Sequence, residues 1–355
     1  MEGFKVIDGA QISSSLSYPA LIDHLHLAFR HADAVLSPPR HHHALPGSSS
    51  SSSYSSAAPT LLLMPAWPCV PSAPSSSYMG VKIVSVFPHN SFAGMPSVSA
   101  SYLLSSALTG VPLAFLDGGE LTLWRTSCVS GLASRHLSNP ESRILLMVGA
   151  GAMAPHLIEA HCTARPSIKT VLIWNRTHSK AESLAQKLQD RWKASECKHC
   201  GNDDKAMTCR SVSACSELEN AARMADIVCC ATLSEAPLIK GSWLRPGSHL
   251  DLVGSFNPNM RECDNDAINQ AMVFVDTPAA IAEAGELTGN AASVKGSLSE
   301  LVKGEKEGRT HSETFTVFKS VGSALVDLAT AQMIYQKLHS PSAGVTAPSS
   351  CSESE

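Results

Sequence analysis

The stretch Arg-Ile-Leu-Leu-Met-Val-Gly-Ala-Gly-Ala-Met-Ala, residues 143–154, decides the fold. Its first half is an apolar run that stops at a glycine, which is typical of a strand buried on both faces of a parallel sheet. Its second half is a GxGxxA turn that leads into a helix. We expect Gly149 to allow the tight turn, Gly151 to let a pyrophosphate approach the backbone, and Ala154 to let the helix pack closely on the strand.

The phosphates of a dinucleotide would lie at the N-terminus of this helix, where free N–H groups and the helix dipole favour anions. Ala152 and Met153 therefore join the two glycines as expected cofactor-binding residues. The alternative is an apolar glycine-rich turn without a ligand. The context favours the cofactor, because a strand precedes the turn, a helix follows it, and a second strand ends about twenty residues later.

The end of that second strand predicts which nucleotide binds. An NAD site would carry Asp or Glu there to hold the ribose hydroxyls. This chain has Asn175, Arg176 and Thr177 instead. An arginine and a hydroxyl can accept a 2′-phosphate, so we expect NADPH, with NADH as the second option. The alternative for Arg176 is a solvated surface charge.

Further apolar runs predict the rest of the sheet. They lie at residues 171–174, 227–231, 249–253 and 272–275, with helix-like segments at 180–192 and 217–224. Alternating strands and helices predict an α/β fold with a doubly wound Rossmann domain. We place this NADP-binding domain at residues 126–320.

The remaining folded chain is expected to form a discontinuous α+β domain from residues 1–125 and 321–340. An amphipathic helix should begin near Ala20. The helix at 321–338 is apolar on nearly every side, with Asp327 as its one acid, which predicts burial. Residues 41–59 contain three histidines and a run of six serines, and residues 341–355 are a polar tail. Both segments have the composition of disordered chain.

Two groups of residues have side chains that can bind a metal ion, but their spacing in the sequence is not that of a metal site. The adjacent His41–His43 point in different directions, with no Cys or carboxylate at ligand spacing. The segment Cys197-Lys-His-Cys200 precedes Cys209 and Cys215, which are spaced more widely than a zinc-binding pair. An exposed loop is favoured over a zinc knuckle, and we expect no metal site.

Composition excludes other function classes. Lys and Arg number 27 against 31 Asp and Glu, giving a net charge of −4 with no basic block, so we expect no nucleic-acid binding. The apolar stretches stop short of the ~18–20 residues that span a bilayer, so we expect no membrane segment.

Only 16% of residues are charged, which predicts extensive apolar burial, including a subunit interface. The 11 scattered cysteines and the absence of a secretory signal favour reduced thiols inside the cell.

Several short motifs resemble one known family, the ornithine cyclodeaminase/mu-crystallin family, from about Val6 to Leu338. Besides the Rossmann stretch and Asn175-Arg176-Thr177, the resemblance is carried by Met64-Pro65-Ala66, Gly80-Val81-Lys82, Leu123-Trp124-Arg125-Thr126, Ala231-Thr232-Leu233-Ser234, Phe318-Lys319-Ser320-Val321-Gly322 and Asp327-Leu328-Ala329. The resemblance implies a homodimer formed through the sheet of the first domain.

The resemblance also implies that Arg40, Lys82 and Arg125 bind the carboxylate of a small substrate. Charge-assisted donors of this kind are what a buried carboxylate needs. Lys82 is in addition the expected acid for an imine nitrogen, since burial lowers the pKa of a lysine. The alternative for Lys82 is a surface lysine beside a strand.

The nicotinamide half of the cofactor is expected beside Thr232 and Ser234, at the end of one strand, and beside Ser320 and Gly322, which enter the last helix. Cyclodeaminases of the family carry an Asp two residues before a Pro in the loop after the fifth strand. Phe256 stands at that position here and cannot accept a proton. Cyclodeamination is therefore disfavoured, and an apolar wall suits a cyclic imine.

The resemblance to plant members of the family implies a ketimine reductase that converts piperideine-2-carboxylate to pipecolate, in the lysine-derived pipecolate pathway of systemic acquired resistance. Two alternatives stay open: an ornithine cyclodeaminase or amino-acid dehydrogenase, and an NADPH-dependent small-ligand-binding protein. The same resemblance implies a plastid location, whereas the early helix near Ala20 leaves little room for a transit peptide and favours the cytoplasm. The sequence does not decide the ring size of the substrate, because one methylene is worth only about 1–3 kcal/mol.

Overall fold

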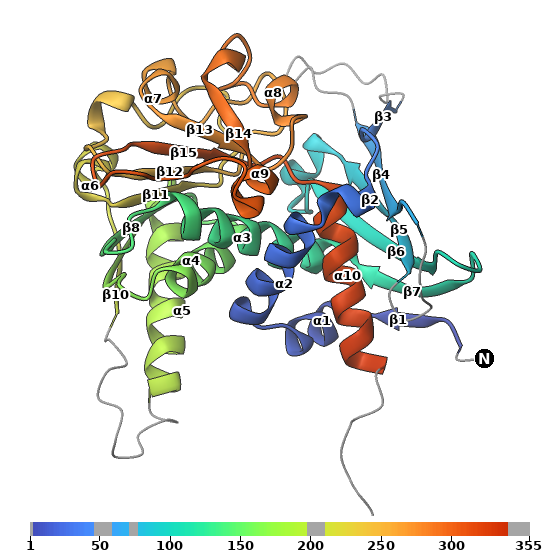
Figure 1. Cartoon of the computed structure of the whole chain (residues 1–355). Coiled ribbons are helices and arrows are strands. Elements are labelled where there is room, and N and C mark those ends of the chain that lie inside the picture. Colours follow the sequence, from blue (N-terminus) through green and yellow to red (C-terminus); the bar gives the residue numbers. More distant parts are fainter. Residues whose placement is uncertain (1–2, 46–58, 71–76, 197–209, 340–355) are drawn as a thin grey trace, which may run out of the picture.

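The chain builds two β-sheets that lie beside each other, with helix α3 (Gly118–Leu137) packed between them (Figure 1). The computed structural model describes residues 3–45, 59–70, 77–196 and 210–339. Asp117 caps α3 by accepting the N–H groups of Gly119 and Glu120. Most of α3 is buried because it touches both sheets.

The second sheet has the order β10-β9-β8-β11-β12-β15-β13-β14, and all its pairs are parallel. Its strands are β8 (Ile144–Val148), β9 (Thr170–Trp174), β10 (Ser211–Ala214), β11 (Ile227–Cys230), β12 (His249–Leu252), β13 (Met272–Val275), β14 (Val294–Ser297) and β15 (Thr316–Lys319). Its helices are α4 (Met153–Ala164), α5 (His178–Glu196), α6 (Leu218–Met224), α7 (Asn265–Asn269), α8 (Ala280–Glu283) and α9 (Leu298–Lys303).

Alternate side chains of each strand enter two different cores, as the strand period requires. Leu145 and Met147 of β8 pack under α4 and α5, whereas Leu146 and Val148 pack on the opposite face with α6. Helices therefore cover both faces, which makes this a doubly wound sheet and confirms the predicted α/β fold class.

The five predicted strands of this sheet are confirmed, and three others were not predicted as strands. The strand β10 has small polar residues, and β14 is interrupted by a glycine. The strand β15 comes late in the chain yet inserts between β12 and β13. Because of this position, the residues that follow β15 and lead to the C-terminal helix leave the sheet at its carboxyl edge, beside the ends of β12 and β13.

The first sheet has the order β1-β7-β6-β5-β4-β2, with β3 also pairing with β4, and its pairs are antiparallel except β1 with β7. Its strands are β1 (Lys5–Ile7), β2 (Val35–Leu36), β3 (His41–Ala44), β4 (Thr60–Pro68), β5 (Tyr78–Val86), β6 (Val98–Ser106) and β7 (Pro112–Asp117). The accompanying helices are α1 (Gly9–Ser15), α2 (Tyr18–Arg30) and α10 (Ala324–His339). Short 3₁₀ helices lie at Ala32–Ala34, Pro88–Ala93, Gly241–Trp243 and Ala291–Ser293.

The C-terminal helix α10 packs on the inner face of this first sheet together with α3. It is buried along most of its length, as its apolar sequence predicts, but it begins at Ala324 rather than at Val321. On the same inner face, Met64, Lys82, Tyr102 and Leu116 lie next to one another across four strands. This row places Lys82 in the middle of the sheet, under α10.

One expectation about disorder is wrong. Residues 41–44 were predicted to begin a disordered insertion, but they form the edge strand β3, hydrogen-bonded along β4. The apolar residues of β4 provide a template for this pairing, which composition alone does not show. Residues 46–58 of that insertion, the Cys197–Cys200 segment and the 341–355 tail lie outside the described residues. Among the described helices, none is both long and apolar enough to cross a membrane.

Candidate active site

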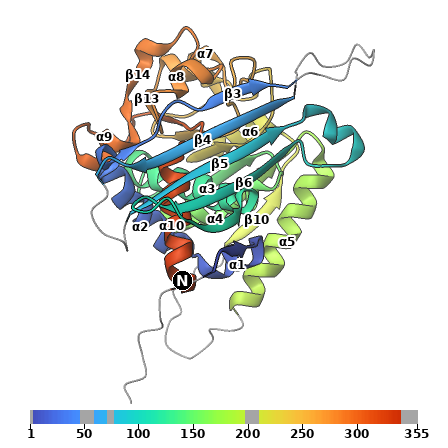
Figure 2. The same cartoon turned by 90° about the vertical axis from the view of Figure 1, so that its right-hand side faces the viewer.

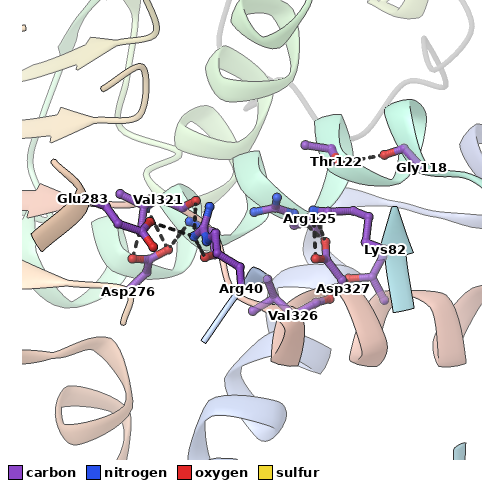
Figure 3. A network of polar contacts seen from close by, with 12 residues as sticks. Arg40, Lys82, Gly118, Thr122, Arg125, Asp276, Glu283, Val321, Val326 and Asp327 are labelled. Atoms are coloured by element: carbon purple, nitrogen blue, oxygen red, sulfur yellow. Dashed lines mark hydrogen bonds and ion pairs between the residues drawn. The ribbon is translucent and has the colours of Figure 1, made fainter. Parts of the chain in front are cut away.

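A buried ion-pair cluster lies between the first sheet and α10. The two carboxylate oxygens of Asp327 lie 2.9 and 2.8 Å from Nζ of Lys82, and Oδ1 also lies 2.9 Å from Nε of Arg125 (Figure 3). Asp327 is 0% exposed and Lys82 only 2%. Strand β5, helix α3 and helix α10 each contribute one charged group to a site that excludes water.

The environment of Lys82 gives it the pKa of an acid that works near neutral pH. Burial and the positive charge of Arg125 together lower the pKa of Lys82 to about 8, while Asp327 opposes the shift. Asp327 was not singled out for the site by its sequence. The sequence does contain an indication of its role, because a single acid in an otherwise apolar helix needs a cationic partner when it is buried.

Arg40 reaches the site from the segment before β3. Its Nη2 donates to the carbonyl oxygens of Val321 at 3.0 Å and Gly322 at 2.7 Å, and lies 3.2 Å from Oε2 of Glu283. In Figure 3, Arg125 lies between this group and the Lys82–Asp327 pair. The structure therefore brings Arg40, Lys82 and Arg125 together, as predicted.

The turn at Val321 and Gly322 holds these groups at fixed positions. Asp276, which follows β13, accepts the backbone N–H groups of Val321 at 3.1 Å and Gly322 at 2.6 Å. Gly322 has a positive φ of 84°, and a Cβ there would lie 2.6 Å from Nη1 of Arg125. Only a glycine fits this close approach.

The dinucleotide turn has the shape that its sequence predicts. Gly149 has a φ of 111°, and a Cβ there would lie 2.6 Å from the carbonyl oxygen of Ala231, whereas Gly151 has open space around its Cα. Ala152 is the N-cap of α4, and Met153 is its first residue, so the free N–H groups of the helix lie beside the turn. These residues fit a bound pyrophosphate.

The predicted 2′-phosphate site lies at the end of β9. The side-chain oxygen of Asn175 accepts the N–H of Ala150 at 3.2 Å, and its amide donates to the carbonyl of Thr177 at 2.9 Å. Asn175 thus joins the dinucleotide turn to the segment after β9. Arg176 and Thr177 are exposed, which leaves both available to a ligand.

The predicted nicotinamide residues lie at the carboxyl edge of the same sheet. Thr232 follows β11, but both its N–H and its hydroxyl donate to the buried carboxylate of Glu262. Ser234 donates to the carbonyl of Ala236, and Ser320 is buried after β15, with no hydrogen-bond partner for its hydroxyl among the described residues. Glu262 has no motif around it and was missed by the sequence analysis.

A second buried polar group lies beneath α4. Asp251 of β12 lies 3.0 Å from Nε2 of His161 and accepts the thiol of Cys229 at 3.4 Å. These three are potential metal ligands. Burial raises the pKa of the Cys229 thiol, which favours a protonated hydrogen-bond donor over a thiolate ligand. The contacts therefore form a polar network that ties α4 to β11 and β12.

A doubly wound sheet with a dinucleotide turn, beside a buried lysine and two arginines, defines a nicotinamide-dependent oxidoreductase. The chain belongs to the ornithine cyclodeaminase/mu-crystallin family, whose sequence profile matches residues 10–342.

Individual relatives agree with this assignment. Protein SAR DEFICIENT 4 of Arabidopsis thaliana is 44% identical, covering 93% of this chain and 96% of its own. Ketimine reductase mu-crystallin of Mus musculus is 32% identical, covering 77% and 85%. Among solved structures, the Delta(1)-pyrroline-2-carboxylate reductase of Thermococcus litoralis in complex with NADH and L-proline superimposes with a TM-score of 0.81, at 26% identity and with 94% and 97% coverage.

Proposed function

We propose that the protein is an NADPH-dependent ketimine reductase that reduces the cyclic imine piperideine-2-carboxylate to pipecolate. The observation that carries this proposal is the buried Lys82, whose pKa of about 8 makes it a proton donor near neutral pH, beside Arg125 and Arg40. A protein that only binds a small ligand does not need such a donor. The names of the mouse and Thermococcus relatives, both reductases of C=N bonds, support the same chemistry.

Each charged group has a role in this reaction. Arg40 and Arg125 would hold the substrate carboxylate, because guanidinium groups bind carboxylates through paired hydrogen bonds. Lys82 would keep the ring nitrogen protonated, which makes the adjacent carbon electrophilic. The bound nicotinamide supplies the hydride to that carbon. The product is the cyclic amine, with its new hydrogen on carbon from the cofactor and its proton on nitrogen from the Lys82 side.

Contacts within the protein hold Arg40 in place for the substrate. Glu283 and the carbonyl oxygens of Val321 and Gly322 all contact its Nη2, and among the described residues no acceptor contacts its other N–H groups. Phe256, half-buried after β12, offers an apolar side chain where a cyclodeaminase has an acid. These features favour a small cyclic imino acid over ornithine.

For the cofactor we propose NADPH over NADH. Arg176 and Thr177 lie exposed at the end of β9, where a 2′-phosphate would be bound, and no acid stands there to hold the ribose hydroxyls. For the biological role we propose the lysine-derived pipecolate synthesis of plant systemic acquired resistance. This rests on the likeness to the Arabidopsis protein.

We also propose that the first sheet forms a homodimer. On its outer face, Val6, Phe115, Leu103, Val81 and Pro65 lie next to one another across five strands. Val6 is 70% exposed and Phe115 38%, and no described helix covers this face, which Figure 2 shows from the front. A continuous apolar row on an open sheet face fits a second copy of the same row.

The test is consumption of NADPH, followed by absorbance, with piperideine-2-carboxylate, with pyrroline-2-carboxylate, and with ornithine plus NAD. Turnover with the cyclic imines and none with ornithine would support the reductase, and the ratio of kcat/KM for the two imines would give the ring size. Turnover with ornithine would instead identify a cyclodeaminase. Tight NADPH binding with no turnover of any substrate would identify a ligand-binding protein.

A further inference from the structure

The side chain of Glu262 connects two segments at the carboxyl edge of the doubly wound sheet. Its Oε1 accepts the N–H of Thr232 at 2.7 Å and the hydroxyl of Thr232 at 2.8 Å, and its Oε2 accepts the N–H of Gly254 at 2.8 Å. Thr232 follows β11 and Gly254 follows β12. The Glu262 carboxylate is 0% exposed. It accepts the N–H groups of Thr232 and Gly254, which are the first beyond the ends of β11 and β12 that strand pairing leaves free.

The segment at Thr232 lies against the dinucleotide turn, and the segment at Gly254 lies against Thr232. A Cβ at Gly149 would lie 2.6 Å from the carbonyl oxygen of Ala231 and 3.4 Å from Cγ2 of Thr232. A Cβ at Gly254 would lie 2.0 Å from the carbonyl oxygen of Thr232. The turn is thus packed closely on the segment at Thr232, where β8 and β11 adjoin, and that segment is packed closely on Gly254. In doubly wound sheets the dinucleotide binds at this switch point.

Burial and the polar contacts of Glu262 act on its pKa in opposite directions. Burial raises the pKa of Glu262, while the ammonium of Lys319, at the end of β15, and the hydrogen bonds from Thr232 limit this rise. Lys319 is 0% exposed and has no hydrogen-bond partner for Nζ among the described residues, so its charge is not neutralised by a direct contact. The N–H of Glu262 itself donates to Oε1 of Glu286 at 2.8 Å, which fixes the backbone of the acid.

We propose that Glu262 is a positioning residue for the nicotinamide cofactor. Its carboxylate holds the segments at Thr232 and Gly254 in the arrangement that receives the cofactor, and it acts through them without touching the cofactor. The two oxygens are both needed, because three donors converge on them. An amide has one accepting oxygen and would turn its own NH₂ group toward one of the buried N–H donors.

The inference rests on the proposed cofactor function, so cofactor binding is measured directly, by fluorescence titration with NADPH and with NADH. Glu262→Gln should weaken the binding of both nucleotides by about tenfold, the effect of one unsatisfied buried donor. The KM for the imino acid should stay unchanged at saturating cofactor. An equal effect on both nucleotides separates this role from 2′-phosphate recognition.

Glu286→Gln is the matched control. Glu286 is as buried as Glu262, but it accepts one N–H, which an amide oxygen accepts equally well, so cofactor affinity should not change. Thermal unfolding and circular dichroism report the fold of each variant. If Glu262→Gln does not fold, Thr232→Val removes the hydroxyl bond to Glu262, together with the long 3.4 Å bond that this hydroxyl accepts from the N–H of Ser234, and should weaken the binding of both nucleotides severalfold.

Unchanged cofactor affinity in a folded Glu262→Gln protein, or equal weakening in both Gln variants, would overturn the inference. A wild-type protein that binds neither nucleotide would refute the proposed function instead, and the two failures are therefore distinguishable.

Discussion

Lys82 and Asp327 are 245 residues apart in the sequence, yet their charged atoms lie within 2.9 Å of each other. One comes from the centre of β5 and the other from the first turn of α10. Arg125 approaches the same carboxylate, so two cations share one buried anion. In such a group the acid raises the proton affinity of the lysine against the effects of burial and of Arg125, because a nearby negative charge favours the ammonium form.

Lys82 should act as an acid with a pKa of about 8. In the free enzyme, kcat/KM for the imine should therefore fall about tenfold per pH unit above that value, as the ammonium loses its proton. The pH profile with saturating NADPH checks this. Lys82→Ala should lower kcat by about 10²–10⁴-fold and remove the alkaline limb, while NADPH affinity stays intact. Full turnover in this variant would exclude Lys82 as the proton donor.

Asp327→Asn tests the origin of that pKa. Asp327 raises the pKa of Lys82 against burial and Arg125, so loss of its charge should move the alkaline limb to lower pH. The same change breaks a buried pair and should lower the free energy of unfolding by about 3–5 kcal/mol, measured by denaturant titration. An alkaline limb at the same pH in a folded variant would belong to the substrate nitrogen and not to Lys82.

Arg176→Ala should raise the KM for NADPH by about 10–100-fold and leave the KM for NADH unchanged, because a charge-assisted bond to the 2′-phosphate is worth about 1.5–3 kcal/mol. Lys180→Ala is the control, since Lys180 is an exposed cation in the first turn of α5. An unaltered ratio of NADPH to NADH efficiency would remove Arg176 from the cofactor site.

The sequence predicted the doubly wound sheet because most of its strands are apolar runs that can be recognised from local sequence alone. The run at 144–148 is apolar at every position, as a strand covered on both faces must be, and the GxGxxA turn adds glycines at fixed positions. The strand β10 was missed because Ser211–Ala214 alternates small polar residues at an edge of the sheet. The edge position of β3 likewise depends on a partner, β4, that no local pattern of residues 41–44 shows.

The residues of the site can also be divided into those that the sequence predicted and those that it did not. Arg40, Lys82 and Arg125 were found through short motifs that resemble a family. Glu262 was missed because its role depends on two backbone N–H groups, 30 and 8 residues away in the sequence, that only the fold brings to one carboxylate. Asp327 lay inside a recognised motif, but its function depends on which cations the fold brings to α10. Local sequence patterns therefore do not show which side chains interact with groups that are far away in the sequence.

Glu283 should orient Arg40 for the substrate carboxylate. Their side chains are 21% and 12% exposed and lie 3.2 Å apart, so the pair is screened only in part. Glu283→Gln should raise the KM for the imino acid about fivefold and leave kcat and NADPH affinity unchanged, since a partly exposed pair contributes about 1 kcal/mol. Arg40→Ala should raise the same KM much further, and Glu283→Gln should then have no additional effect. If the two changes multiply instead, Glu283 acts on the substrate by a route that does not include Arg40.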